Sequence, residues 1–306
     1  MVRVTQSMLS TNMLRNLNTS YSKMSNYQEM LTSGRKFARA SEDPVAAVKG
    51  MNYRVQLDKV QQFQRNINEA EAWLDTTDTS LDQVGSVLNR VKELVVQAAN
   101  DTNTSDDREK IKMEIDQIRQ QVQDVANTQL GGKFIFSGTK TSTRTFENGG
   151  INQQLLNNPQ ALNGKVEVEV FDGIQLTVNT TGAPDMFKEI DTFLGDVSTA
   201  LTNATSGGPI GDFLGSIADG TSNTLANMQG KVLNARADVG ARMNRVELMK
   251  NRLDIQEINT TKQMSNNEDT DYAETITKMT TQESIHQAVL SVGAKIIQQT
   301  LVDFIR

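Results

Sequence analysis

The chain has 306 residues, 37% of them hydrophobic and 5% aromatic, with a formal net charge of −6 at pH 7. This acidic balance argues against nucleic acid or an anionic membrane as a partner, because both are bound through basic surfaces. The absence of cysteine excludes disulfides and thiolate metal sites. The sequence shows neither the apolar core of a secretory signal nor a run of eighteen apolar residues. We therefore expect a soluble chain which, if exported, uses a route without a cleaved signal.

Residues 8–31 carry a sparse apolar stripe at heptad spacing among many Asn, Ser and Thr residues. Because these polar residues compete for the helix backbone, we expect a weak helix that frays until a partner covers the stripe. Gly34 is suited to a left-handed helix cap. Asp43 and Pro44 fit the N-cap and the first position of the next helix.

The most regular pattern spans residues 67–98, where apolar or small residues recur at alternating steps of three and four. This spacing is typical of a coiled-coil seam and predicts a helix from residue 44 to about residue 100. A short turn and an acidic start at residue 105 predict a third, antiparallel helix that stops at Gly131 and Gly132. For Trp73, the only tryptophan, we favour packing over a binding hot spot.

The middle of the chain changes from helical to strand-like patterns. Residues 134–136 read as a short strand, and two alternating runs around Asp172 and Gly173 predict a β-hairpin with a type I′ turn. Residues 139–164 are expected to be mostly loop. Residues 184–201 form an amphipathic helical pattern. We interpret this section as a small insert.

Helical periodicity returns over residues 225–256, which supply a long partner for residues 67–98. Glu268, Asp269 and Asp271 then form an acidic interruption, expected to be a solvated hinge because they lack the ligand spacing of a calcium loop. The final segment, 276–304, is apolar over more than half its circumference, which favours contact with neighbouring subunits.

These patterns predict a mainly α fold: an elongated, coiled-coil-like multi-helix bundle formed by both terminal thirds, with a small β-containing (α+β) insert between them. We expect terminal assembly helices in 1–43 and 268–306, a long helical bundle in 44–130 and 215–267, and the insert in 131–214. The bundle core is assigned to Leu74, Leu81, Val84, Leu88, Val91, Ile115, Ile118, Val122, Val232, Val239, Val246 and Leu253. The assembly interface is assigned to Leu14, Leu17, Tyr21, Met24, Leu31, Ile285, Val289, Val292, Ile296, Leu301 and Phe304.

The sequence contains no recognisable catalytic constellation. With one histidine and no cysteine, neither a Ser/His/Asp triad nor a zinc site with several His ligands is expected. We therefore predict a protein without enzymatic activity, cofactor or metal. For His286 we favour a packing or interface role, with a pH-sensitive contact as the alternative.

Several segments carry a family resemblance: Thr5-Gln6-Ser7-Met8 and the residues at 31–35, 41–47, 93–100, 131–138, 239–245 and 298–304. They resemble the flagellar axial proteins, and most closely the hook-filament junction family of hook-associated protein three. The proline in Ser41-Glu42-Asp43-Pro44 and the Gly-aromatic motif at 131–138 favour this family over the related flagellins. His286 departs from the family pattern, where an aromatic residue is expected.

The resemblance implies an extracellular structural adaptor in the bacterial flagellum, exported by the flagellar type III route, with a chaperone on its C-terminal segment. Its implied partners are an adjacent hook-associated protein, flagellin, and copies of itself in a ring-like or helical layer. Two alternatives stay open: a flagellin-type filament subunit, and a cytoplasmic coiled-coil signalling or chaperone protein, which the heptads also permit.

Overall fold

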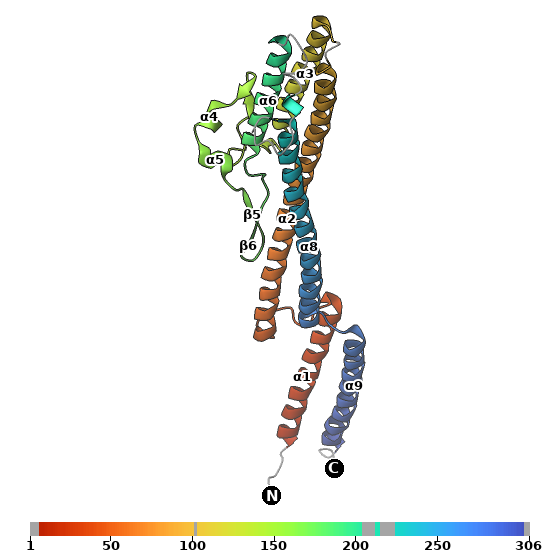
Figure 1. Ribbon diagram of the computed structural model, residues 1–306. Coiled ribbons are helices and arrows are strands. Elements are labelled where there is room, and N and C mark those ends of the chain that lie inside the picture. The colour runs from red at the N-terminus through yellow and green to blue at the C-terminus, as the bar shows by residue number, and fades with distance from the viewer. Residues whose placement is uncertain (1–5, 101–102, 204–211, 215–223, 303–306) are drawn as a thin grey trace. The chain divides into compact units, whose positions relative to one another are not determined.

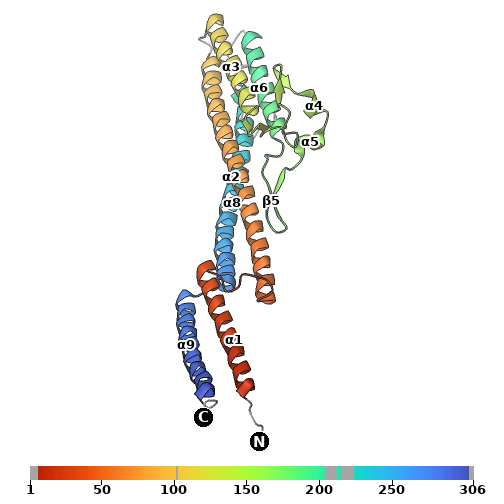
Figure 2. The ribbon, with the colours of Figure 1, turned by 180° about the vertical axis from the view of Figure 1, so that it is seen from behind.

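A computed structural model describes residues 6–100, 103–203, 212–214 and 224–302 (Figures 1 and 2). The chain divides into two compact units: a terminal unit of residues 1–59 and 255–306, and a central unit of residues 60–254. Two long helices, α2 (Pro44–Ala98) and α8 (Leu225–Glu268), contribute to both units. The predicted mainly α fold with small β elements is confirmed. None of the described helices carries an apolar stretch long enough to cross a membrane.

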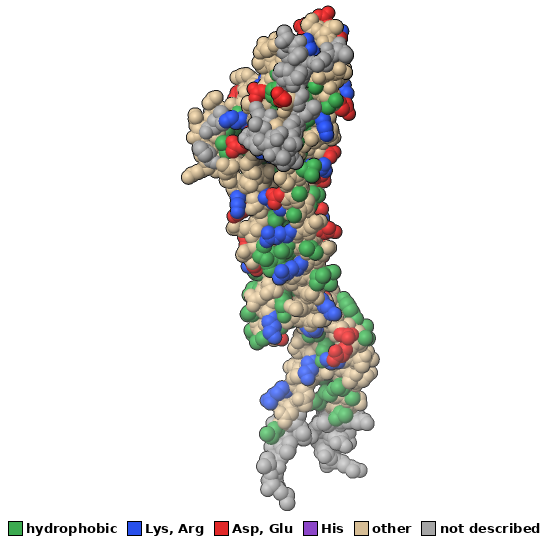
Figure 3. Space-filling model, viewed as in Figure 1, with side chains coloured by type: hydrophobic (Ala, Val, Ile, Leu, Met, Phe, Trp, Pro, Cys, Tyr) green, Lys and Arg blue, Asp and Glu red, His purple; other side chains and the backbone are tan. Residues whose placement is uncertain are grey.

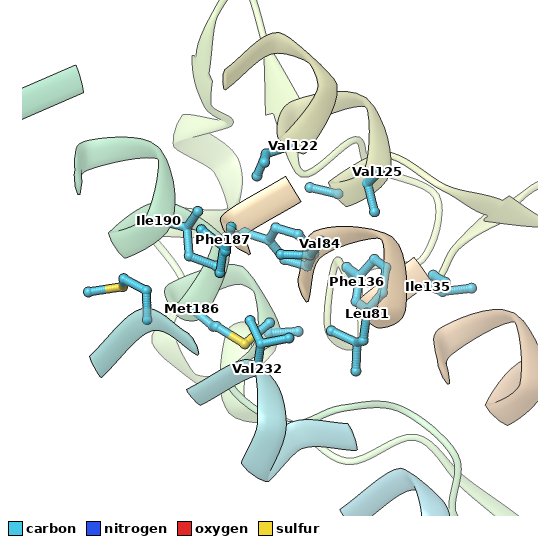
Figure 4. Close-up of a cluster of buried hydrophobic side chains, with 14 of the residues drawn as sticks. Leu81, Val84, Val122, Val125, Ile135, Phe136, Met186, Phe187, Ile190 and Val232 are labelled. Atoms are coloured by element: carbon cyan, nitrogen blue, oxygen red, sulfur yellow. The ribbon is translucent and has the colours of Figure 1, made fainter. Parts of the chain in front are cut away.

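The central unit packs parts of α2 and α8 with α3 (Ser105–Ala126) and α6 (Ala183–Asn203) around one hydrophobic core. Helices α3 and α6 lie side by side in both views of the ribbon. Figure 4 shows side chains from all four helices and from the β region meeting in this core. They include Leu81 and Val84 of α2, Val122 of α3, Phe187 of α6 and Val232 of α8.

Helix α2 begins and continues as its sequence predicts. The Ala46 backbone N–H donates to Asp43 Oδ1 at 2.9 Å, so Asp43 caps the helix and Pro44 occupies its first position. The seam residues of 67–98 are each no more than 1% exposed: Ile67, Ala70, Leu74, Thr77, Leu81, Val84, Leu88, Val91, Val95 and Ala98. Burial of this unbroken stripe against neighbouring helices stabilises a helix too long and narrow-striped to persist alone.

Helix α3 ends earlier than predicted. Its last residue is Ala126, and Asn127 forms the C-cap. Gly131 and Gly132, with φ of 57° and 80°, instead turn the chain between strands β1 (Gln129–Leu130) and β2 (Lys133–Phe134). Two consecutive positive φ values are what a type I′ hairpin turn requires, so these glycines serve a turn instead of a helix end.

A second short hairpin lies in the segment expected to be mostly loop. Strands β3 (Phe146–Glu147) and β4 (Gly150–Ile151) are antiparallel, and Asn148 and Gly149 between them have φ of 54° and 78°. The same segment contains the short helices α4 (Gln153–Leu156) and α5 (Pro159–Asn163). The loop prediction for 139–164 was therefore wrong in part.

The predicted hairpin around residue 172 is present as strands β5 (Glu167–Phe171) and β6 (Ile174–Thr177). Its predicted type I′ turn is wrong, because Gly173 has a φ of 72° but Asp172 does not take a positive φ. The register shifts between Glu169 and Phe171, so one strand carries an extra residue beside the turn. This irregularity allows the strands to meet through a turn that needs one left-handed residue.

Helix α6 packs directly on α3. Side chains of the central β region belong to the same core as these helices. The guanidinium of Arg119 donates from Nε and Nη2 to the two carboxylate oxygens of Asp191, each at 2.7 Å. The rings of Phe136 and Phe187 meet edge to face with centroids 4.8 Å apart. The division into a bundle and a separate insert at 131–214 remains a prediction. A short 3₁₀ turn, η1 (Asp212–Leu214), completes the described elements.

The terminal unit pairs the two ends of the chain. Helix α1 (Gln6–Ser33) and helix α9 (Tyr272–Val302) run antiparallel, with the start of α1 and the end of α9 at the same end of the pair (Figures 1 and 2). The apolar stripes of the two terminal helices therefore meet within one pair. Whether α1 frays in a free subunit stays a prediction.

Candidate assembly surface

The contact between α1 and α9 is a seam with coiled-coil spacing. Its members recur at steps of three and four residues, which brings one stripe of each helix to the other. On α1 they are Met13, Leu17, Ser20, Met24, Tyr27 and Leu31, and on α9 they are Thr275, Met279, Gln282, His286, Val289 and Gly293. The Gln282 side-chain amide donates to Ser20 Oγ at 2.7 Å across this seam.

This seam is thinner and more polar than the core of the central unit. Ser20, Thr275 and Gly293 are buried, whereas Leu17, Met24 and Val289 are half-buried. Along α2, by contrast, the 67–98 stripe is almost completely buried. Apolar burial stabilises roughly in proportion to area, so the α1–α9 pair alone gains much less than the central bundle. The pair is therefore suited to further burial by a neighbouring molecule.

The residues assigned from the sequence to the assembly interface fall into two groups. Leu17, Met24, Leu31 and Val289 contribute to the α1–α9 seam. Four others lie on the outer surface, where their exposed fractions are 59% for Leu14, 63% for Tyr21, 47% for Ile285 and 56% for Val292. The side chains of Ile296, Leu301 and Phe304 lie outside those that the structure describes. The apolar residues assigned at heptad spacing therefore include both seam and surface positions.

His286 contributes to the seam near Tyr21, their ring centroids being 6.4 Å apart and tilted by 50°. Its Nδ1 is buried and has no hydrogen-bond partner among the described residues. This placement agrees with a packing or interface position and leaves the pH-sensitive alternative untested.

A further apolar stripe was not assigned to the interface from the sequence. Val45, Val48, Met51 and Val55, on the first turns of α2, are each 54% to 65% exposed. Ile255 and Ile258 on α8 are 62% and 66% exposed. Figure 3 shows such apolar side chains on the surface around these helices. The signal was available in the sequence, because the apolar spacing of α2 begins before residue 67. These residues extend the candidate surface beyond α1 and α9.

The connection from α1 to α2 and the connection from α8 to α9 meet at a crossing of the chain within the terminal unit. Gly34 has a φ of 71°, and its N–H donates to the Met30 carbonyl at 2.9 Å, which confirms the predicted left-handed cap. The Lys36 N–H donates to the Glu268 carbonyl at 2.7 Å, and the Thr270 N–H to the Gly34 carbonyl at 2.9 Å. These backbone bonds join the two connections within the terminal unit.

Glu268 is buried at this crossing, so the prediction of a solvated hinge was wrong for this residue. Its exposed fraction is 6%, and its carboxylate forms an ion pair with Arg54 on α2. The side chain lies over Gly50, where a β-carbon would collide with Glu268 Oε1. Among the described residues, no three His, Asp or Glu side chains are grouped so as to hold a metal ion. Glu268 is thus placed for packing and ion pairing, whereas Asp269 and Asp271 are exposed.

The residues assigned to the bundle core lie inside the central unit, each with an exposed fraction of 7% or less. They are Leu74, Leu81, Val84, Leu88, Val91, Ile115, Ile118, Val122, Val232, Val239, Val246 and Leu253. Ion pairs flank this core: Arg236 on α8 pairs with Asp78 and Asp82 on α2, and Lys250 pairs with Glu71 at 2.7 Å. Hydrogen bonding to Asp78 is the main cause that raises the Arg236 pKa. The central unit therefore combines a buried apolar core with ion pairs between α2 and α8.

Comparison with known proteins shows which protein families this chain resembles. Residues 4–141 match the model of the bacterial flagellin N-terminal helical region, and residues 224–305 match that of the bacterial flagellin C-terminal helical region. The terminal thirds of the chain are thus those of a flagellin-type axial protein of the bacterial flagellum.

Relatives that align over nearly the whole length of the chain point to a particular family within this class. Flagellar hook-associated protein 3 of Escherichia coli K12 is 27% identical over 93% of both chains, and flagellin of Bacillus subtilis 168 is 26% identical over 97% of both. A putative flagellar hook-associated protein from Vibrio parahaemolyticus has the same fold, with a TM-score of 0.60, 22% identity and coverage of 74% of this chain and all of that one. Bacillus cereus FlgL matches with a TM-score of 0.55 and 24% identity, over 70% of this chain and 99% of that one. The chain belongs to the flagellar hook-associated protein 3 family, a branch related to the flagellins.

Proposed function

We propose that the chain is a structural adaptor subunit between a hook-associated layer and the flagellin filament. The observation that carries this proposal is the terminal unit, whose paired helices bury a thin seam and leave apolar residues such as Leu14, Tyr21 and Val292 exposed. Exposure of such an apolar surface to water is unfavourable, and contact with another subunit would remove this exposure. Its partners would be an adjacent hook-associated protein, flagellin, and further copies of this chain.

We further propose that each domain of the chain has a separate role in the assembled flagellum. The terminal helices of 1–43 and 268–306 make the assembly contacts, the bundle of 44–130 and 215–267 gives rigidity, and the insert of 131–214 faces outward. The proposed role as a structural subunit requires no catalytic activity, in keeping with the structural character of its relatives. Export would follow the flagellar type III route, with a chaperone covering the apolar C-terminal segment until assembly.

Substitution of the exposed residues tests the interface directly. Leu14→Asp combined with Tyr21→Asp places charges on the outer face of α1, where both side chains are well exposed. The free subunit should still fold, because both side chains are mostly exposed and only the Tyr21 ring reaches a seam residue, His286. Its incorporation into flagella should fall at least tenfold by immunodetection on sheared filaments. The matched control is Met113→Asp, at a site 62% exposed on α3 of the central unit. Equal incorporation of both variants would contradict the proposal.

Truncation tests the division of labour. Removing the residues from Ile276 onward should abolish incorporation while the central unit keeps its thermal unfolding transition, because its core lies within residues 60–254. Limited proteolysis of the free, full-length chain should trim both termini before it cuts the central unit. Normal junction assembly by the truncated chain would count against a role for α9.

A filament subunit is the second candidate, because the Bacillus subtilis flagellin matches over 97% of both chains. A filament subunit would seed and extend long filaments from pure protein, whereas an adaptor would require a preformed end. Sedimentation of the purified chain with and without flagellin seeds separates the two functions. Recovery of the uncleaved chain on sheared flagella would also exclude the cytoplasmic signalling or chaperone alternative.

A further inference from the structure

Three methionine side chains contribute to the seam between α1 and α9. Met13 and Met24 lie on α1 and Met279 lies on α9, and all three are half-buried. Methionine suits an irregular contact of this kind, because its side chain is unbranched and flexible. Part of the apolar contact between the two helices therefore comes from thioether groups whose side chains solvent still reaches.

The end of the Met13 side chain packs against Gly293, which has no side chain of its own. A β-carbon at position 293 would overlap the Met13 methyl group and crowd its sulfur, so the sulfur lies close to the α9 backbone. An oxygen bonded to this sulfur would either meet that backbone or draw the side chain towards water, because a sulfoxide is strongly polar. Both arrangements weaken the contact between α1 and α9.

Methionines elsewhere in the chain are placed differently. Met186 and Met228 belong to the central core and are 7% and 0% exposed, which keeps a dissolved oxidant away from their sulfurs. Met51 and Met113 are 56% and 62% exposed, so a sulfoxide at either position would remain in water. The seam methionines differ from both groups, because they combine access from solvent with a packing role.

The stability of the surrounding contact determines what the same chemical change does. Met243 and Met249 are also partly buried, but they pack against a core in which most apolar side chains are almost completely buried. The α1–α9 seam has few such residues and gains correspondingly little from apolar burial. A contact of this kind also opens locally more often, which gives a small oxidant further access.

We propose that Met13, Met24 and Met279 form an oxidation site through which peroxides weaken the α1–α9 pair. A lone pair on the thioether sulfur forms an S–O bond with hydrogen peroxide while the O–O bond breaks, and the displaced hydroxide takes up the remaining proton to give water. The sulfur loses two electrons and the peroxide gains them, so the products are methionine sulfoxide and water. Methionine sulfoxide reductases return the sulfoxide to the thioether. The consequence for subunit assembly rests on the proposed function, whereas the effect on the helix pair does not.

The experiment measures oxidation and hydrogen exchange in the same full-length chain. The chain is treated with hydrogen peroxide until peptide mass spectrometry shows that most Met13 carries one added oxygen atom. The backbone amides of α1 should then exchange about tenfold faster or more, whereas those of α3 in the central unit should change by less than about twofold. Reduction by methionine sulfoxide reductases specific for each sulfoxide epimer, with dithiothreitol, should restore slow exchange.

Two variants locate the effect. The seam variant combines Met13→Leu, Met24→Leu and Met279→Leu, which replace the thioethers with side chains of similar volume. Its α1 amides should not respond to peroxide. The matched control combines Met51→Leu with Met113→Leu, which removes exposed methionines outside the seam. This control should respond to peroxide as the unmodified chain does.

Several results would overturn the proposal. They are a largely oxidised Met13 without faster α1 exchange, a seam variant that still responds to peroxide, and a Met13 that stays unoxidised while Met113 is fully converted. An α1 without protected amides before oxidation would also overturn it, because the free chain would then have no seam to weaken. If the seam variant fails to fold, oxidation and reduction of the unmodified chain still decide.

Incorporation of the oxidised chain into flagella is measured separately. Loss of α1 protection together with normal incorporation would support the oxidation site and contradict the proposed role of the terminal helices in assembly. Unchanged α1 protection would overturn the oxidation site and leave that role as it stands. The failure of one proposal is therefore distinguishable from the failure of the other.

Discussion

The side-chain methyl of Met13 on α1 occupies the position that a β-carbon would take at Gly293 on α9, so this glycine sets how closely the two helices approach. Any side chain at position 293 must move the end of the Met13 side chain. We predict that Gly293→Leu destabilises the α1–α9 pair by about 1–3 kcal/mol, as overpacking does elsewhere. Faster hydrogen exchange of the α1 backbone amides would measure this loss.

Gly240 on α8 provides the matched control, because a β-carbon there would meet no atom within 4 Å. Gly240→Leu should therefore stabilise its helix by several tenths of a kcal/mol through helix propensity alone. Adding Met13→Ala to Gly293→Leu should restore part of the lost protection by making room for the new side chain. Equal effects at both glycines would show that close approach at position 293 is unimportant.

A second prediction concerns the ion pair that joins α3 to α6. Asp191 is largely buried, and hydrogen bonding to its carboxylate is the main cause that raises the Arg119 pKa. Removing one partner of a largely buried pair leaves the other poorly compensated, although the 34% exposure of the Arg119 side chain reduces the effect. Asp191→Asn should lower the unfolding free energy of the central unit by about 2 kcal/mol in urea titration.

The comparison for Asp191 is an exposed ion pair in the same unit. Glu71→Gln removes the partner of Lys250, and both side chains are more than 40% exposed. It should leave the urea midpoint unchanged within error, because exposed pairs contribute little. A double-mutant cycle of Asp191→Asn with Arg119→Met should show clear coupling. Additive effects would contradict a direct contribution of this pair.

The long helices could be predicted because their signals are local and repeated. Asp43 marks the start of α2 as its N-cap, and a continuous apolar stripe such as Leu74 to Val95 shows which face of the helix is buried. The short hairpins were harder. Asn148-Gly149 is a standard type I′ signal, but it stands between strands of two residues each and so lacks flanking alternation. Asp172-Gly173 has that alternation, yet the extra residue near Glu169 selects a different turn.

The candidate surface was predictable only as a stripe. Leu14 and Leu17 belong to the same apolar pattern, and only the position of α9 decides that Leu17 lies in the seam while Leu14 stays exposed. Glu268 shows the same limit more strongly. Its burial depends on Gly50 and Arg54, more than two hundred residues away in the chain, so its local acidic surroundings indicated solvent.

The packing of Glu268 over Gly50 gives a third prediction. Gly50→Ala should destabilise the crossing, because its new methyl group would collide with the Glu268 carboxylate and disturb the ion pair with Arg54. Glu268→Ala should itself cost about 1 kcal/mol, a small value because Arg54 remains half exposed and is rehydrated. In the Glu268→Ala background, Gly50→Ala should become nearly neutral. Hydrogen exchange at Lys36 and Thr270 reports the crossing, and additive effects would contradict the packing.

The last prediction concerns pH and the start of α3. The Asp107 N–H donates to Thr104 Oγ1 at 3.3 Å and the Thr104 N–H donates to Asp107 Oδ2 at 3.4 Å, which closes a capping box. The Thr104 hydroxyl also donates to Asp107 Oδ2, at 2.7 Å. Hydrogen bonding from Thr104 lowers the Asp107 pKa. A carboxylate with a lowered pKa stabilises the folded state above its unfolded pKa, and this contribution is lost as pH falls through the folded pKa. The first turn of α3 should therefore lose protection in acid. Carboxyl NMR titration should show that Thr104→Val raises the Asp107 pKa toward its ordinary value, and an unchanged titration would contradict the cap.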